Sequence, residues 1–231
     1  MAVEQLLTVS LPAASFSLVL AAPARTPAPA VICVPSIFGL TPEAHRWLDQ
    51  YTQAGFLTAV YDPFWRTDPG PLSPLDDSER ARARARRDSA SAGDATNDLA
   101  AAIDRVRALP ECTGKVAVAG YCFGGRYAFV AAARLPIDAA LSFHGILVGR
   151  SIEVAPEIRT PIQLHYGSID PEAPMSEIDA LRAATAGNPN VEIDVYPGVG
   201  HSFTWRNYPK FHPEAAAKSE ARALQLLETL R

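Results

Sequence analysis

Short, mostly apolar segments of strand length alternate with stretches of helical character along most of this chain, and no other feature constrains its fold as strongly. The apolar runs lie at residues 30–34, 57–61, 116–119, 139–143, 162–166 and 191–196. Such a run is typical of a strand covered on both faces, as in a parallel sheet. Helices are predicted at residues 41–54, 78–87, 95–109, 125–134, 175–186 and 215–230. The alternation predicts an α/β fold with a mostly parallel central sheet and helices on both faces.

The first ninety residues carry signals of other kinds. Residues 6–9 and 16–20 are predicted to form an antiparallel hairpin around Pro12. Thr41 followed by Pro42 predicts a helix start, with the threonine as N-cap. The proline-rich residues 62–77 predict a loop. The alternating Ala-Arg run that follows could suggest an amphipathic strand, but its Ala, Arg and Glu composition favours a helix with a solvated face.

Length and composition limit the classes of protein that fit. The chain has 231 residues, 48% of them hydrophobic, without an internal repeat, which predicts a single domain over residues 1–231. A net charge of −4 argues against a general nucleic-acid binder. The start of the chain could imitate a signal peptide, but Glu4, the late first basic residue and Pro12 argue against secretion. We therefore expect no nucleic-acid or membrane partner, and the oligomeric state stays open.

The number and spacing of the three cysteines indicate in which cellular compartment the protein is expected. Cys33 lies in an apolar run and is expected to be a buried small hydrophobe, Cys112 lies in a connector, and Cys122 follows a predicted strand. The number is odd and no pair has the spacing of zinc ligands or of a redox motif. A reducing, cytoplasmic location without a metal or other cofactor is the expectation.

The segment Gly120-Tyr121-Cys122-Phe123-Gly124-Gly125 is the strongest chemical signal in the chain. It follows a predicted strand and opens a helix, the context required of the G-x-nucleophile-x-G elbow. Side chains at the flanking positions would collide with nearby backbone, and the helix N-terminus favours a thiolate at Cys122. The N–H of Phe123 would donate to an oxyanion. The alternative is a glycine-rich turn that holds a buried cysteine.

A histidine and a carboxylate are available in the order that such an elbow requires, nucleophile, then acid, then histidine. His201 lies in Gly198-Val199-Gly200-His201-Ser202-Phe203, just beyond a predicted strand, and Asp170 follows another strand before Pro171. All three residues fall at the carboxyl ends of strands, where sheets of this kind bind ligands. His201 would take or hold the thiol proton and Asp170 would orient it.

Other residues of the same types have weaker positions. Asp170 could instead begin a turn, as Asp before Pro often does, but Asp194 falls inside a strand and Asp179 on a helix face. The remaining histidines are interpreted as structural, since they lie before or close to the elbow, within a strand or at a helix end; these are His45, His144, His165 and His212.

With these motifs in place, the chain resembles the dienelactone hydrolase family. The resemblance rests on the GYCFGG elbow, on Ser168-Ile169-Asp170-Pro171, on Gly200-His201-Ser202-Phe203 and on Ile37-Phe38-Gly39, in order over nearly the whole chain. It implies an α/β-hydrolase fold and a cytoplasmic, metal-independent hydrolase that opens an unsaturated, carboxylate-bearing lactone. It also implies a second oxyanion donor, the N–H of Ile37.

The chain departs from the family pattern at its predicted substrate contacts. Family members carry a glutamate that helps to activate the cysteine where this chain has Ser36, so activation would rest on His201 and the helix terminus. Arg80 matches a family arginine that binds the substrate carboxylate, whereas Arg84 and Arg87 replace aromatic residues. We expect these two on the solvated surface. Arg206 falls one residue beyond a second carboxylate-binding arginine. Ser202 and Phe203 complete the predicted substrate-binding set.

Three functions are consistent with these residues. The first is covalent opening of a lactone or small activated ester by Cys122, His201 and Asp170 through a thioester. The second is a general carboxylesterase or thioesterase on the same scaffold. The third, suggested by Ser36, is a ligand-binding protein without catalysis. Metal binding is the weakest hypothesis, because no Cys–His pair has ligand spacing.

Overall fold

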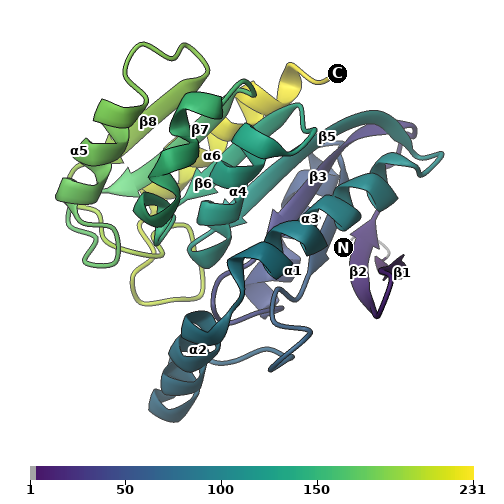
Figure 1. Ribbon diagram of the computed structural model, residues 1–231, viewed down its shortest axis with the longest axis horizontal. Coiled ribbons are helices and arrows are strands. Elements are labelled where there is room, and N and C mark those ends of the chain that lie inside the picture. The colour runs from purple at the N-terminus through teal and green to yellow at the C-terminus, as the bar shows by residue number, and fades with distance from the viewer. Residues whose placement is uncertain (1–3) are drawn as a thin grey trace. The chain divides into compact units, whose positions relative to one another are not determined.

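The computed structural model describes residues 4–231, which divide into two compact units at residues 116 and 117 (Figure 1). Its described strands are β1 (Glu4–Ser10), β2 (Ser15–Ala21), β3 (Ala28–Val34), β4 (Leu57–Tyr61), β5 (Cys112–Tyr121), β6 (Ala139–Phe143), β7 (Ile162–Gly167) and β8 (Val191–Tyr196). Its described helices are α1 (Pro42–Gln53), α2 (Asp77–Ser89), α3 (Ala92–Arg107), α4 (Phe123–Arg134), η1 (Val148–Glu157), α5 (Met175–Ala184) and α6 (Pro213–Glu228).

The first unit contains the predicted hairpin. β1 and β2 pair antiparallel, β2 continues antiparallel to β4, and β4 runs parallel to β3. The helix α1 packs on β2, β3 and β4, and α3 packs on β1 and β3. Every residue of β3 and β4 is buried, as the continuous apolar runs predicted.

Helix starts follow local chemistry, with one correction. Pro42 occupies the first turn of α1 as predicted, but the Thr41 side chain makes no capping hydrogen bond. The arginine-rich run is a helix, α2, whose N-cap Asp76 accepts a hydrogen bond from the Glu79 N–H. The second unit contains a 3₁₀ segment, η1, that no sequence pattern had indicated.

The second unit is a parallel sheet in the order β5-β6-β7-β8. Tyr121 is aligned with Phe143 and Phe143 with His165, so β5 and β6 end at the same level and β7 continues two residues further. Both α4 and α6 contact β6, and Figure 1 shows α4 in front of the strands and α6 behind them. Residues that follow β5, β6 and β7 are therefore brought to one edge of the sheet.

Whether the 231 residues form one domain, as the sequence predicts, stays a prediction. No described helix has both the length and the apolarity needed to cross a membrane.

Candidate active site

The turn between β5 and α4 has the strained geometry of a nucleophile elbow. Cys122 is the residue between the two elements, and its φ of 54° and ψ of −111° are rarely adopted by a residue with a side chain. Such a conformation costs about 1–3 kcal/mol and persists only where the surroundings impose it. Here the Cys122 N–H donates to the Phe143 carbonyl at 3.0 Å, and its own carbonyl accepts from Gly125 and Ile146 at 3.0 and 3.1 Å.

The glycines of the elbow are required by close packing. A Cβ on Gly120 would lie 2.1 Å from the Gly124 carbonyl oxygen, and one on Gly125 would lie 2.5 Å from the Gly145 Cα. Both distances are shorter than any real Cβ contact. The turn can therefore close only with glycine at these positions, which is the reason given for the motif from sequence.

Asp170 and His201, from two different loops, meet in a buried hydrogen bond. The Nδ1 of His201 lies 2.7 Å from Oδ2 of Asp170, and Oδ1 of Asp170 accepts from the Glu172 N–H at 2.8 Å. Asp170 is 3% exposed and His201 8%, so water screens this pair little. The carboxylate fixes the tautomer of the ring, because an imidazole with its proton on Nδ1 presents Nε2 on the opposite side.

Backbone contacts tie the two loops together. Ser168 and Ile169 donate to the carbonyls of Tyr196 and Val199, each at 3.0 Å. The Ser168 hydroxyl accepts from the Gly198 N–H at 2.8 Å. A Cβ on Gly167 would lie 2.2 Å from the Val199 carbonyl oxygen, so the approach depends on this glycine. The acid and the histidine are thus positioned as one substructure.

The Cys122 side chain lies close enough to the His201 ring to act on the pKa of His201. Burial by itself would lower the pKa of His201, but the Cys122 thiolate and the Asp170 carboxylate outweigh burial and raise it to about 10. His201 is therefore an imidazolium at neutral pH whenever Cys122 is ionised. This arrangement can attack an electrophilic carbon with sulfur and can return a proton from Nε2.

A second histidine, His144, lies beside His201. Their ring centroids are 4.9 Å apart and the ring planes are inclined by 75°. The place of His144 in the sequence, shortly after the elbow, predicts a structural role. Its position directly after β6, level with Cys122 after β5, is the signal that could have found it.

The predicted oxyanion donors belong to different units. Phe123 is the first residue of α4, and its ring packs on Tyr127 at 5.0 Å. Ile37 lies in the first unit, where its carbonyl accepts from Arg86 Nε at 2.8 Å. Arg86 is 2% exposed, an outcome that the solvated-face prediction for this arginine-rich run did not anticipate. The role of the Ile37 N–H stays a prediction from the family resemblance.

The predicted substrate-binding residues also belong to both units. Ser36 is buried, and its hydroxyl accepts from the Phe38 N–H at 3.2 Å. Arg80 donates to the Pro74 carbonyl at 3.0 Å and pairs with the exposed Asp77. Both belong to the first unit, so their part in substrate binding is untested.

In the second unit, Ser202 and Phe203 directly follow His201 and are buried, and Ser202 has a φ of 60°. Arg206 is exposed and pairs with Glu220 of α6 at 3.1 Å. Of the two arginines expected at the surface, Arg84 is exposed and Arg87 is partly buried beside Asp88.

The other candidate acids and histidines have structural partners. Asp194 pairs with Arg222 at 2.7 Å, and Asp179 with Arg182 at 3.1 Å. His165 is fully buried, 3.1 Å from the Tyr196 hydroxyl. His212 caps α6 by accepting from the Ala215 N–H.

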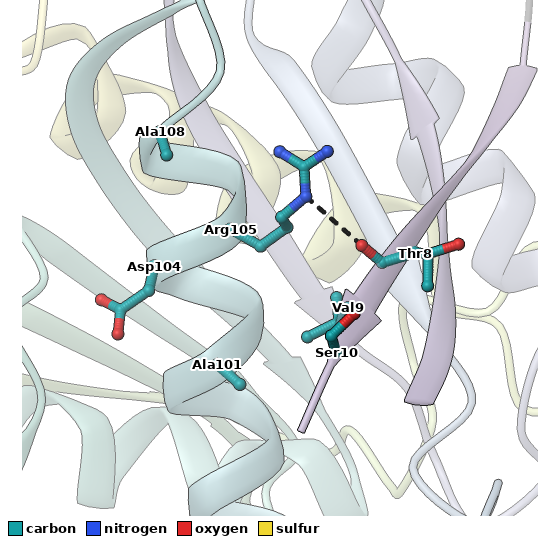
Figure 2. A pocket seen from close by; sticks show the side chains of 7 residues that line it. All are labelled: Thr8, Val9, Ser10, Ala101, Asp104, Arg105 and Ala108. Atoms are coloured by element: carbon teal, nitrogen blue, oxygen red, sulfur yellow. Dashed lines mark hydrogen bonds between the residues drawn. The ribbon is translucent and has the colours of Figure 1, made fainter. Parts of the chain in front are cut away.

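Figure 2 shows a surface hollow between β1 and α3 in the first unit, where Arg105 donates to the Thr8 carbonyl at 3.3 Å. It is lined by Thr8, Val9, Ser10, Ala101, Asp104, Arg105 and Ala108. None of these residues belongs to the predicted catalytic set.

Comparison with solved structures establishes the fold. A Klebsiella pneumoniae protein described as a candidate dienelactone hydrolase superposes with a TM-score of 0.86 over 99% of both chains, at 22% identity. The dienelactone hydrolase of Anabaena variabilis gives a TM-score of 0.74 over 100% of this chain and 99% of that one, at 20% identity. The predicted α/β-hydrolase fold, with a mostly parallel sheet and helices, is confirmed.

Sequence comparison establishes the family. Carboxymethylenebutenolidase 1 of Cupriavidus pinatubonensis is 34% identical over 217 residues, which cover 94% of this chain and 92% of the relative. The carboxymethylenebutenolidase of Pseudomonas putida is 28% identical over 218 residues, with the same coverage. The sequence profile of the dienelactone hydrolase family matches residues 16–231. With nearly its full length matched, the chain belongs to the dienelactone hydrolase family and is a hydrolase.

Proposed function

We propose that this hydrolase opens a lactone or a small activated ester through covalent catalysis by Cys122, His201 and Asp170. The observation that carries the proposal is the buried hydrogen bond between Nδ1 of His201 and Asp170, and the effect of the Cys122 thiolate on the pKa of His201 supports it. A strained elbow at the end of β5 supports the same assignment. The relatives named carboxymethylenebutenolidase support a lactone substrate.

In the first step, the Cys122 thiolate attacks the carbonyl carbon and forms a C–S bond. Negative charge develops on the carbonyl oxygen, near the N–H of Phe123 at the N-terminus of α4. The C–O bond to the leaving oxygen then breaks, and that oxygen takes the proton of the His201 imidazolium. A thioester results, with the leaving group still attached when the substrate is a lactone.

In the second step, His201, now neutral, accepts a proton from water as the water attacks the thioester carbon. The C–S bond breaks, the product leaves as a carboxylic acid, and Cys122 returns to the thiolate beside the imidazolium. Asp170 keeps its hydrogen bond to Nδ1 of His201 throughout and holds the ring in one orientation.

Ser36 limits how the cysteine is activated. A buried hydroxyl that already accepts from Phe38 cannot act as the carboxylate base expected at this position. Activation then depends on His201 and on the N-terminus of α4, and we propose that Ser36, Arg80, Ser202, Phe203 and Arg206 contribute at most to substrate binding. Three free cysteines support a cytoplasmic location.

The test is turnover of p-nitrophenyl acetate and of a dienelactone by the Cys122→Ala variant. We expect loss of turnover on both substrates. Cys112→Ala is the matched control, since it removes another free cysteine and should keep full activity. Retained activity in Cys122→Ala would refute the proposal. Wild-type turnover of the ester but not of the dienelactone would instead indicate a general esterase.

A further inference from the structure

We propose that His144 is a positioning residue for His201, holding the imidazole ring in the orientation in which it faces Cys122. This inference rests on the proposed function and adds a residue to its machinery. It comes from the contacts of His144, which surround the ring on several sides within the second unit.

The backbone of His144 is fixed in an unusual conformation. It follows the last residue of β6 with a φ of 41°, in the left-handed region that residues with side chains seldom adopt. Its N–H donates to the His165 carbonyl of β7 at 2.7 Å, a short bond that holds the residue there. Cys122 and Ser202 also have a positive φ, so the backbone is strained at the elbow and directly after His201 as well.

The ring of His144 is packed against His201. Besides the edge-to-face contact at 4.9 Å, it meets the Phe203 ring at 5.6 Å and the Tyr121 ring at 6.4 Å. His144 is 1% exposed, so it has no room to move away. The bond to Asp170 fixes one atom of His201 but permits rotation about that bond. The His144 ring blocks that rotation.

The protonation state of His144 is compatible with a positively charged His201 beside it. Its Nε2 lies 3.1 Å from the Thr204 hydroxyl, and its Nδ1 is buried without a hydrogen-bond partner. Burial, and then the positive charge of His201, hold the pKa of His144 well below its usual range. Cys122 and Asp170 are the groups that raise the pKa of His201, and His201 in turn lowers the pKa of His144. A neutral His144 adds no second positive charge beside the His201 imidazolium.

The experiment measures alkylation of Cys122 by iodoacetamide in a Cys112→Ala background. Three variants are compared: His144→Phe keeps a ring, His144→Gln keeps a polar group without a ring, and His144→Ala keeps neither. At pH 6.5 we expect the Gln and Ala variants to react about tenfold more slowly, because the thiolate then lacks a well-placed imidazolium. The Phe variant should stay within about threefold of the wild-type rate.

At pH 10 an ordinary thiol is largely ionised, so all variants should react within about twofold of one another. If His144 had only a structural role, each variant would differ from the wild type by the same factor at pH 6.5 and at pH 10. Equal rates for Gln and wild type at pH 6.5, or a loss in Phe that Gln does not share, would overturn the positioning role. The comparison of Phe with Gln decides the matter even when the Ala variant does not fold. Slow alkylation of the wild-type background at pH 6.5 would contradict the proposed function instead.

Discussion

Replacing Gly120 with alanine is the sharpest test of how the elbow is built. The new Cβ would lie 2.1 Å from the Gly124 oxygen, 2.4 Å from its carbonyl carbon and 2.7 Å from the Gly125 nitrogen. These are backbone atoms, which cannot rotate away as a side chain would. The two sides of the turn must therefore separate by about 1 Å before the contact becomes tolerable.

We expect both the thermal stability and the activity of the Gly120→Ala variant to fall. Overpacking of this kind costs about 3 kcal/mol, which lowers Tm by about 6–12 °C in a chain of this size. Cys122 lies between the two glycines that must separate, and a displacement of about 1 Å at a nucleophile lowers kcat about 100-fold. Thermal unfolding and p-nitrophenyl acetate hydrolysis measure the two effects.

Gly93→Ala is the matched control. Gly93 lies in α3, where a Cβ would have only the Ser91 hydroxyl within 4 Å, at 3.9 Å. The helix should gain about 0.5–1 kcal/mol and activity should not change. A Gly120→Ala variant that melts within about 2 °C of the wild type and keeps its activity would refute the requirement for glycine at this position.

Three further predictions concern charge. Asp170→Asn should lower kcat about a thousandfold with little change in KM, and a loss below tenfold in steady-state kinetics would contradict its orienting role. By NMR, His201 should stay protonated until about pH 10, and Cys122→Ala should lower its pKa; an unchanged pKa would exclude the thiolate as a cause. Because the folded pKa is raised, the contribution of His201 to stability is complete below pH 6.5 and is lost as pH rises through about 10. Arg206→Ala removes an exposed ion pair with Glu220 that is worth less than about 1 kcal/mol, so Tm should not change. A role in substrate binding would instead raise KM for a carboxylate-bearing lactone but not for p-nitrophenyl acetate.

The fold was predictable because apolar residues dominate strands such as β3, β4 and β6. β4, β6 and β8 have the predicted bounds. β5 begins four residues before its predicted start, at Cys112, because its first residues alternate between partly buried and exposed and include Thr113 and Lys115. The segment η1 was missed because a 3₁₀ turn with Pro156 inside it has no helical period.

At the site, the order of the motifs sufficed to propose Cys122, Asp170 and His201. It did not suffice for His144, whose contacts depend on the pairing of β6 with β7 and on Thr204, sixty residues further along the chain. The burial of Arg86 within a basic run could not be predicted from the sequence either. Its three backbone acceptors, the carbonyls of Ile37, Asp68 and Gly70, come from loops without a pattern.

The pH dependence of alkylation with iodoacetamide is the strictest test of whether His201 sustains a thiolate at Cys122. The Cys112→Ala background removes one competing thiol, and burial raises the pKa of Cys33, which keeps that thiol unreactive. We expect fast alkylation of Cys122 well below pH 8.5, the pH at which an isolated thiol is half ionised, and a large loss of this reactivity in His201→Ala. A profile centred near pH 8.5 that His201→Ala leaves unchanged would contradict it.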